Sequence, residues 1–325
     1  MKRLCFVLTT VACLGCGENP PPAPSPTAPV VSAPAGSASG ESAGKLSEAR
    51  RGFQTVLARK EKANEPVEEP PRGVFEKVSY PAAPGPLAAY VTPDPGDGRK
   101  RPAIVWITGG DCNTIGDVWS DGERENDQTA AQYRKAGIVM MFPSLRGGNQ
   151  NPGFKEGFLG EVEDVLSAAD YLSKLPYVDP ERIYLGGHST GGTLALLVAE
   201  SSSRFRAVFS FGPVGIIAGY GPEFLVYDVS NSEETKLRTP LLWLDSVETP
   251  TFVIEGAVDG NGDQFKMMQA RTKNPMLRWR LVAKADHFSV LAPVNELVAK
   301  KILADAEAGT AIEITQQELA NAIGR

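Results

Sequence analysis

The stretch Arg182-Ile-Tyr-Leu-Gly-Gly-His-Ser-Thr-Gly-Gly-Thr193 contains the pattern G-x-S-x-G at residues 187–191. A short apolar run before the pattern predicts a buried strand, and the small and apolar residues after it predict a helix. Glycines on both sides of the serine suit a sharp turn between them, because only residues without side chains let the backbone pass closely. Such a turn lifts Ser189 above the edge of a sheet and aims the N–H of Thr190 at a developing oxyanion. We therefore predict that Ser189 is a nucleophile.

A second copy of the pattern, Gly40-Glu-Ser-Ala-Gly44, lies in a segment rich in proline, alanine and serine. No apolar run precedes this copy and no helical pattern follows it. Because the turn needs a strand before it and a helix after it, we exclude Ser42 as a nucleophile.

Strands and helices alternate on both sides of the turn at Ser189. A hairpin is predicted over 74–92, strands over 102–107, 137–142, 182–185, 206–210, 251–254 and 279–283, and helices over 128–135, 158–175, 193–200 and 294–307. This alternation predicts one mainly parallel sheet covered by helices on both faces. Together with the serine turn it indicates the α/β-hydrolase fold. The residues between 210 and 251 predict a small lid insertion.

A serine hydroxyl needs a positioned base, and the chain has only two histidines, His188 and His287. His188 is the immediate neighbour of Ser189, so on a tight turn its side chain points away from the hydroxyl. His287 directly follows the predicted strand 279–283, where a loop returns to the catalytic edge. We therefore predict His287 as the base.

The acid that orients the base is expected between the serine and the histidine in the chain, after a strand. Asp259 lies past the end of the predicted strand 251–254 and is the first choice. Asp263 and Glu255 are the alternatives in the same segment.

A second oxyanion donor is expected from the loop that follows the strand 102–107. The backbone N–H of Gly110 or Asp111 would serve, because two glycines there allow close approach of the substrate. Cys112 in this loop is expected to be a buried thiol and not a nucleophile, since no further histidine remains to activate it.

The composition excludes other classes of function. The net charge is −6 and no basic stripe is present, which argues against a nucleic-acid partner. Two histidines are too few for most metal sites, so no metal is predicted, and the serine chemistry needs no organic cofactor.

The N-terminus predicts export. Lys2 and Arg3 precede a mostly apolar stretch, typical of a signal peptide over residues 1–16. The segment Cys13-Leu-Gly-Cys16 resembles a bacterial lipoprotein cleavage box, which implies a lipid on Cys16, with Cys13 as the alternative. The protein is thus predicted to be membrane-anchored in the cell envelope.

The remaining boundaries follow from composition. Residues 17–71 precede the domain: up to about residue 44 they are Pro/Ala/Ser-rich and are predicted to be a disordered linker. From 45 to 71 they are a charged segment, in which the spacing of Phe53, Val56 and Leu57 allows a short surface helix. The catalytic domain is predicted over 72–310. A short helix is predicted within 311–325, where Thr315-Gln-Gln-Glu318 fits a capping box.

Several motifs together resemble the catalytic domain of the prolyl oligopeptidase group and its dienelactone-hydrolase and acetyl-esterase relatives. They are Trp106-Ile-Thr-Gly-Gly110, Pro143-Ser-Leu-Arg-Gly-Gly148, the stretch 177–192 and Asp286-His-Phe288. The resemblance implies Ser189, Asp259 and His287 as a triad, and Thr190 as an oxyanion donor. The chain departs from many relatives at Thr108, where they have His or Tyr, and residues 17–71 cannot form a propeller.

The sequence thus predicts hydrolysis of a small ester or a short peptide through an acyl-enzyme on Ser189. The alternative is a non-catalytic lipoprotein of the same fold that binds a ligand or a partner. Because all three triad residue types are present in the expected order, the enzyme is favoured.

Overall fold

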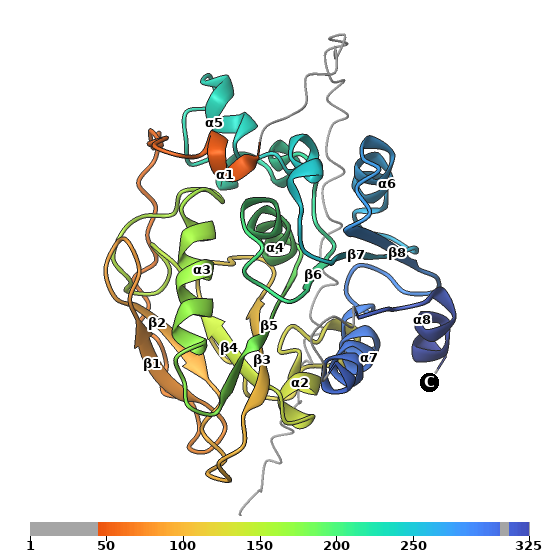
Figure 1. Ribbon diagram of the computed structural model, residues 1–325. Helices are drawn as coiled ribbons and strands as arrows, with labels where there is room; N and C mark the ends of the chain where they lie inside the picture. The colour runs from red at the N-terminus through yellow and green to blue at the C-terminus, as the bar shows by residue number, and fades with distance from the viewer. Residues whose placement is uncertain (1–44, 306–311, 325) are drawn as a thin grey trace, which may run out of the picture. The chain divides into compact units, whose positions relative to one another are not determined.

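The computed structural model describes residues 45–305 and 312–324. They build an eight-stranded sheet with the order β1-β2-β4-β3-β5-β6-β7-β8, parallel except at β1 and β2 (Figure 1). Its strands are β1 (Glu76–Tyr80), β2 (Leu87–Val91), β3 (Arg101–Ile107), β4 (Val139–Pro143), β5 (Val178–His188), β6 (Val208–Phe211), β7 (Thr251–Gly256) and β8 (Leu277–Val282). The predicted signal peptide, Cys13, Cys16 and the second G-x-S-x-G copy lie outside the described residues.

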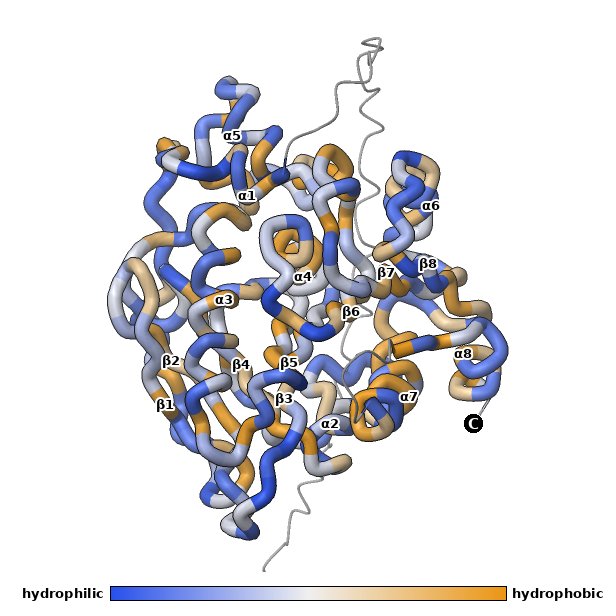
Figure 2. The backbone as a smooth tube through the Cα atoms, in the orientation of Figure 1, coloured by the Kyte–Doolittle hydropathy of each residue, from blue (hydrophilic) through white to orange (hydrophobic). Residues whose placement is uncertain are grey.

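Helices cover both faces of the sheet, as the sequence predicts. The helices are α1 (Leu46–Ala49), α2 (Ala131–Lys135), α3 (Glu161–Leu172), α4 (Thr190–Ser201), α5 (Ser232–Lys236), α6 (Gly262–Arg271), α7 (Leu291–Ala304) and α8 (Gln316–Ile323). Buried residues of α3, α4 and α6 form one core, and those of α2, α7 and α8 form the other, on the opposite face (Figure 1). Hydrophobic residues recur along the inner strands and along α4 and α7 (Figure 2).

The parallel register brings four chain segments to one edge of the sheet. Ile107 at the end of β3 pairs with Gly187 of β5, and His188 pairs with Phe211 at the end of β6. Phe211 in turn pairs with Ile254 of β7. The residues that follow these strands therefore emerge side by side, which is the arrangement a site at the carboxyl edge requires.

The lid insertion follows β6 and consists of short turns. It contains η2 (Ile217–Tyr220), η3 (Pro222–Phe224), α5, η4 (Pro240–Leu242) and η5 (Leu244–Ser246). Trp243 and Leu244 belong to this insertion and are buried in the core. Trp243 also donates its indole N–H to the carbonyl of Lys236 at the end of α5, and this bond links two parts of the lid.

We call residues 45–67 the N-terminal strap. The strap packs against the domain, so the folded part of the chain begins before the predicted boundary at residue 72. The sequence predicts a charged segment outside the catalytic domain, but the strap is held by residues far away in the chain. Leu46 is fully buried in the core, and Arg50 donates to the carbonyls of Phe158 and Leu237. Further along, the N–H of Ala63 donates to the carbonyl of Gly147. Such tertiary contacts override local composition.

The capping box predicted for the C-terminal helix is present at the start of α8. The Thr315 side chain accepts from the N–H of Glu318, and the Glu318 carboxylate accepts from the N–H of Thr315. This reciprocal capping box starts the helix where the sequence places it. In the described ranges, no helix combines the length and the apolar character needed to cross a bilayer.

Candidate active site

Ser189 lies on the sharp turn between β5 and α4. Its backbone has φ 54° and ψ −114°, a conformation that residues with side chains rarely adopt. A Cβ at Gly187 would lie 2.4 Å from the carbonyl oxygen of Gly191, and one at Gly191 would lie 2.3 Å from that of Ile107. The N–H of Ser189 donates to the carbonyl of Phe211 at 2.8 Å, which fixes the turn to the next strand. The glycines of the motif are therefore needed for packing.

His287 lies on the loop between β8 and α7, close to the end of β6. A Cβ at Gly212 would lie 2.3 Å from Cε1 of His287, and one at Gly260 would lie 2.7 Å from its Cβ. Gly212 directly follows Phe211, the residue that binds the backbone of Ser189, so Ser189 and His287 flank the same short segment. The two side chains share no hydrogen bond in the described structure, and such bonds often tighten only when substrate binds.

The carboxylate in contact with His287 belongs to Glu255. Its two oxygens lie 3.2 and 3.4 Å from Nδ1 of His287, and its side chain is only 1% exposed. The same carboxylate accepts from the backbone N–H groups of Gly256 at 2.8 Å and Asn261 at 3.1 Å. These bonds hold the carboxylate in one orientation against the imidazole.

Asp259, the first choice from the sequence, is placed differently. It lies in the turn after β7 with φ 91°, it is exposed, and none of the described hydrogen bonds joins it to His287. Asp263 is exposed as well and faces Lys266 at 3.5 Å. The structure therefore places Glu255, the weighed alternative, in contact with His287 in place of Asp259. Its side chain is longer than that of aspartate, so it reaches the histidine from the end of the strand itself.

The predicted oxyanion donors lie in the loop after β3 and at the start of α4, next to Ser189. The N–H of Gly109 is already bound to Oε1 of Gln128 at 3.1 Å, whereas the N–H groups of Gly110 and Asp111 have no partner among the described residues. The hydroxyl of Thr190 donates to the carbonyl of Gly110 at 2.8 Å and so ties this loop to the nucleophile turn. The first N–H groups of α4, including that of Thr190, lack partners within the helix.

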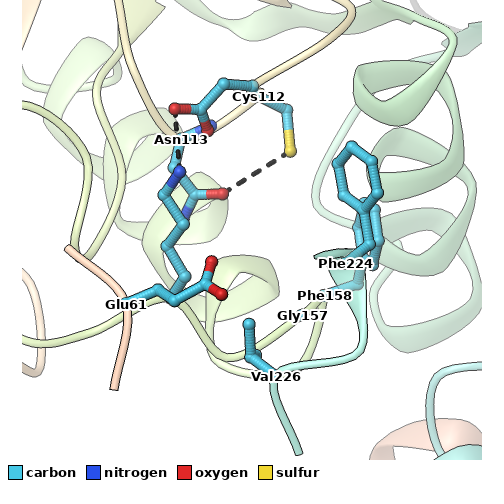
Figure 3. A pocket seen from close by; sticks show the side chains of 9 residues that line it. Glu61, Cys112, Asn113, Gly157, Phe158, Phe224 and Val226 are labelled. Atoms are coloured by element: carbon cyan, nitrogen blue, oxygen red, sulfur yellow. Dashed lines mark hydrogen bonds and ion pairs between the residues drawn. The ribbon is translucent and has the colours of Figure 1, made fainter. Parts of the chain in front are cut away.

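A pocket of about 220 Å³ opens beside this loop. Phe158, Phe224 and Val226 provide an apolar wall, and the polar side chains of Asn113 and Glu61 lie across from them (Figure 3). The remaining lining residues are Asp111, Cys112, Lys155 and Gly157. The pocket is thus mostly apolar with a few charged groups, as is usual for small-molecule sites.

The prediction that Cys112 is a buried thiol is met. Cys112 is buried and free, and burial raises the pKa of its thiol well above the usual range, so it is not a reactive thiolate. Arg146 is a structural residue, because it binds Asp164 and Glu156 at 2.8 and 2.7 Å.

Sequence reasoning missed Tyr220 and Glu61, which come from the lid and the strap. The hydroxyl of Tyr220 lies 2.6 Å from that of Thr193, and its ring stacks on Phe158 at 5.8 Å between centroids. Burial raises the pKa of Tyr220, so the phenol stays protonated. No local pattern marks either residue, because each reaches the site only through packing of the insertion or the strap. In the described residues, no group of three potential metal ligands is present.

The comparisons with known proteins identify the family and the fold. The sequence profile of the prolyl oligopeptidase family matches residues 125–301. Dipeptidyl-peptidase 5 of Porphyromonas gingivalis is 27% identical over 51% of this chain and 27% of its own length. An uncharacterized peptidase of Bacillus subtilis, YtmA, is 29% identical over 40% of this chain and 55% of its own length. The chain thus spans between about a quarter and a little over half of these relatives.

Solved structures show the same fold. An acylaminoacyl peptidase of Pyrococcus horikoshii has a TM-score of 0.57 and 20% identity over 73% of this chain and 43% of its own. A puromycin-hydrolyzing peptidase of Mycobacterium tuberculosis has a TM-score of 0.56 and 21% identity over 71% of this chain and 39% of its own. These likenesses confirm the predicted α/β-hydrolase fold.

Proposed function

Because the chain belongs to the prolyl oligopeptidase family, we propose that it hydrolyses an ester or short-peptide bond with Ser189 as nucleophile, His287 as base and Glu255 as the orienting acid. The observation that carries this proposal is the contact between His287 and the buried carboxylate of Glu255, beside a strained serine turn. A buried carboxylate on one imidazole nitrogen leaves the other nitrogen free to accept the serine proton.

The proposed reaction has two balanced halves. In the first, Oγ of Ser189 forms a bond to the substrate carbonyl carbon while its proton passes to Nε2 of His287. The bond to the alcohol or amine then breaks, and that leaving group takes the proton from His287. In the second half, water gives a proton to His287 and attacks the acyl carbon. The bond between that carbon and Oγ of Ser189 then breaks, Oγ takes the proton back from His287, and the acid is released. Glu255 stabilises the imidazolium in both halves without itself being protonated.

The oxyanion formed in each half would be stabilised by backbone donors. Thr190 and either Gly110 or Asp111 offer N–H groups from two sides of the serine. Such donors act strongly because they are fixed before the reaction starts. Tyr220 offers a protonated phenol close by, from the lid.

The apolar pocket is proposed to hold the side chain or acyl group next to the bond that is cleaved. Replacing Phe224 by alanine removes part of its wall, so KM should rise about tenfold for substrates with a bulky apolar group. KM for acetyl esters, which leave the wall untouched, should stay unchanged. A series of p-nitrophenyl esters of increasing size measures this, with Val229→Ala, an exposed lid valine, as the control. Equal changes for small and bulky esters would contradict the assignment.

The function itself is tested by a fluorophosphonate probe, which reacts only with an activated serine. The wild-type chain should be labelled, and Ser189→Ala and His287→Ala should not be. Ser42→Ala is the matched control, because Ser42 occupies the second G-x-S-x-G copy and should leave labelling intact. A folded wild-type protein that is not labelled would reject the enzyme and favour the ligand-binding alternative.

A further inference from the structure

The nucleophile's neighbour, His188, has a role that the triad does not cover. It ends β5, its side chain is fully buried, and its ring centroid lies 4.5 Å from that of His287. Its Nε2 lies 2.9 Å from the backbone carbonyl oxygen of His287. The side chain thus points away from Ser189, as its position on the turn requires, and toward the loop that carries the base.

The partners of His188 determine where its proton lies. A carbonyl oxygen only accepts, so Nε2 must carry the hydrogen that is donated to His287. On the other side, Nδ1 lies 2.8 Å from Nε2 of Gln128, an amide nitrogen that only donates. Oε1 of the same amide is farther away, at 3.2 Å, and already accepts from the N–H of Gly109. Nδ1 therefore has no hydrogen, and His188 is neutral with its proton on Nε2.

The orientation of the Gln128 amide is itself fixed by a backbone group. Its Oε1 accepts from the N–H of Gly109 at 3.1 Å, and its Nε2 donates to Oδ1 of Asn126 at 2.8 Å. A flipped amide would place NH₂ against the N–H of Gly109 and lose that bond. The backbone of Gln128 is anchored too, since its carbonyl accepts from the indole of Trp106 at 3.1 Å.

The bonds form one chain across the catalytic edge. It runs from the N–H of Gly109 through Gln128 and His188 to the carbonyl of His287. Gly109 precedes the two N–H groups proposed as oxyanion donors, and a Cβ there would lie 2.9 Å from Nδ1 of His188 and 3.3 Å from Cβ of Ser189. Glycine at this position is what lets the oxyanion loop pack against the histidine.

We propose that Gln128 and His188 are positioning residues that hold the oxyanion loop and the base loop at fixed places on either side of Ser189. The inference rests on the proposed hydrolase function. A second proton on Nδ1 of His188 would face the amide hydrogens of Gln128, so the network also keeps His188 from competing with His287 for the serine proton. Consistent with this, burial and the neighbouring His287 lower the pKa of His188 to about 3.

The first test is the protonation state of His188, and it does not depend on activity. The chain contains two histidines, so ¹⁵N-histidine labelling of the full chain gives two imidazoles to assign, with His287→Ala identifying His188. Long-range ¹H–¹⁵N spectra should show His188 neutral, with its hydrogen on Nε2, throughout pH 5–9. A hydrogen on Nδ1, or titration of His188 within this range, would overturn the proposal.

The second test is the effect of the network on catalysis. Gln128→Met keeps the length of the side chain and removes its hydrogen bonds, so kcat and the rate of fluorophosphonate labelling should fall about tenfold to a hundredfold. KM should change less than about threefold, because the pocket is untouched. Gln128→Glu still accepts from Gly109 but cannot donate, so His188 should take up a second proton and show imidazolium shifts.

Gln132→Met is the matched control. This nearby glutamine binds Asp127 at 2.7 Å and makes no described contact with His188, so its loss should leave kcat and the His188 spectrum as in the wild type. Unchanged kcat in Gln128→Met, or an equal loss in both variants, would overturn the positioning role. If the His188 spectrum is as expected but the probe does not label the protein, the hydrolase function is rejected. The role of the network in catalysis is then rejected too, whereas its hydrogen-bond pattern stands.

Discussion

Glu255→Gln should lower kcat/KM about ten-thousand-fold, whereas Asp259→Asn should leave it within about twofold of the wild type. Glutamine retains the size of the side chain and most of its bonds to the backbone of Gly256 and Asn261. It loses the charge that stabilises the imidazolium, and its NH₂ group can force His287 into the wrong tautomer. Asp259 is exposed in the turn beyond β7, so its charge is screened by solvent.

The measurement is kcat/KM for ester hydrolysis by each variant. Thermal unfolding of each variant shows that it is folded. Glu255→Asp adds a further comparison, because the shorter carboxylate keeps its charge but no longer spans the 3.2 Å contact with His287. We expect Glu255→Asp to lie between the wild type and Glu255→Gln. A large loss in Asp259→Asn with little effect in Glu255→Gln would restore Asp259 as the acid.

Arg238→Met should destabilise the protein by about 3–5 kcal/mol, because it leaves the buried carboxylate of Glu234 without its charge partner. Both side chains are fully buried and 2.6 Å apart. The Glu234 carboxylate also accepts from the hydroxyl of Thr55 and the N–H of Val56 in the N-terminal strap. Arg238 donates to the carbonyl of Glu156 and to Thr55. One ion pair therefore joins the lid, the strap and the loop before α3.

Urea unfolding at neutral pH measures this change. Glu233→Gln is the control, since Glu233 forms an exposed pair with Lys236 on the same helix at 3.6 Å and should cost less than about 0.5 kcal/mol. The double variant Glu234→Leu/Arg238→Met removes both charges and should be less destabilised than Arg238→Met alone. A double variant that is as unstable as the sum of the two single ones would contradict the argument.

Much of the fold could be predicted because its signals are local. The G-x-S-x-G turn, the apolar runs of β3, β4 and β7 and the capping box of α8 each follow from a few adjacent residues. The helix α6 was not predicted, since only Phe265 and Met268 of it are buried and little apolar periodicity remains.

The sequence limits the orienting acid to three candidates but does not identify which of them contacts His287. Chain order and strand position left Asp259, Asp263 and Glu255, and the distance to His287 then depends on the turn after β7. A usable signal is present in retrospect: Glu255 is a charge inside an apolar strand, and buried charges need a partner. The role of Gly260 has no local signal, because only the folded chain shows that a side chain there would collide with His287.

The N-terminal strap changes what counts as the smallest intact form of this protein. A polypeptide that starts at residue 72 would lack Leu46, leave part of the core exposed and leave Glu234 without two of its donors. It would also lose Glu61 from the wall of the pocket. A fragment for crystallisation or for assays should therefore begin at or before Lys45, because removal of the strap takes contacts away from both the lid and the pocket.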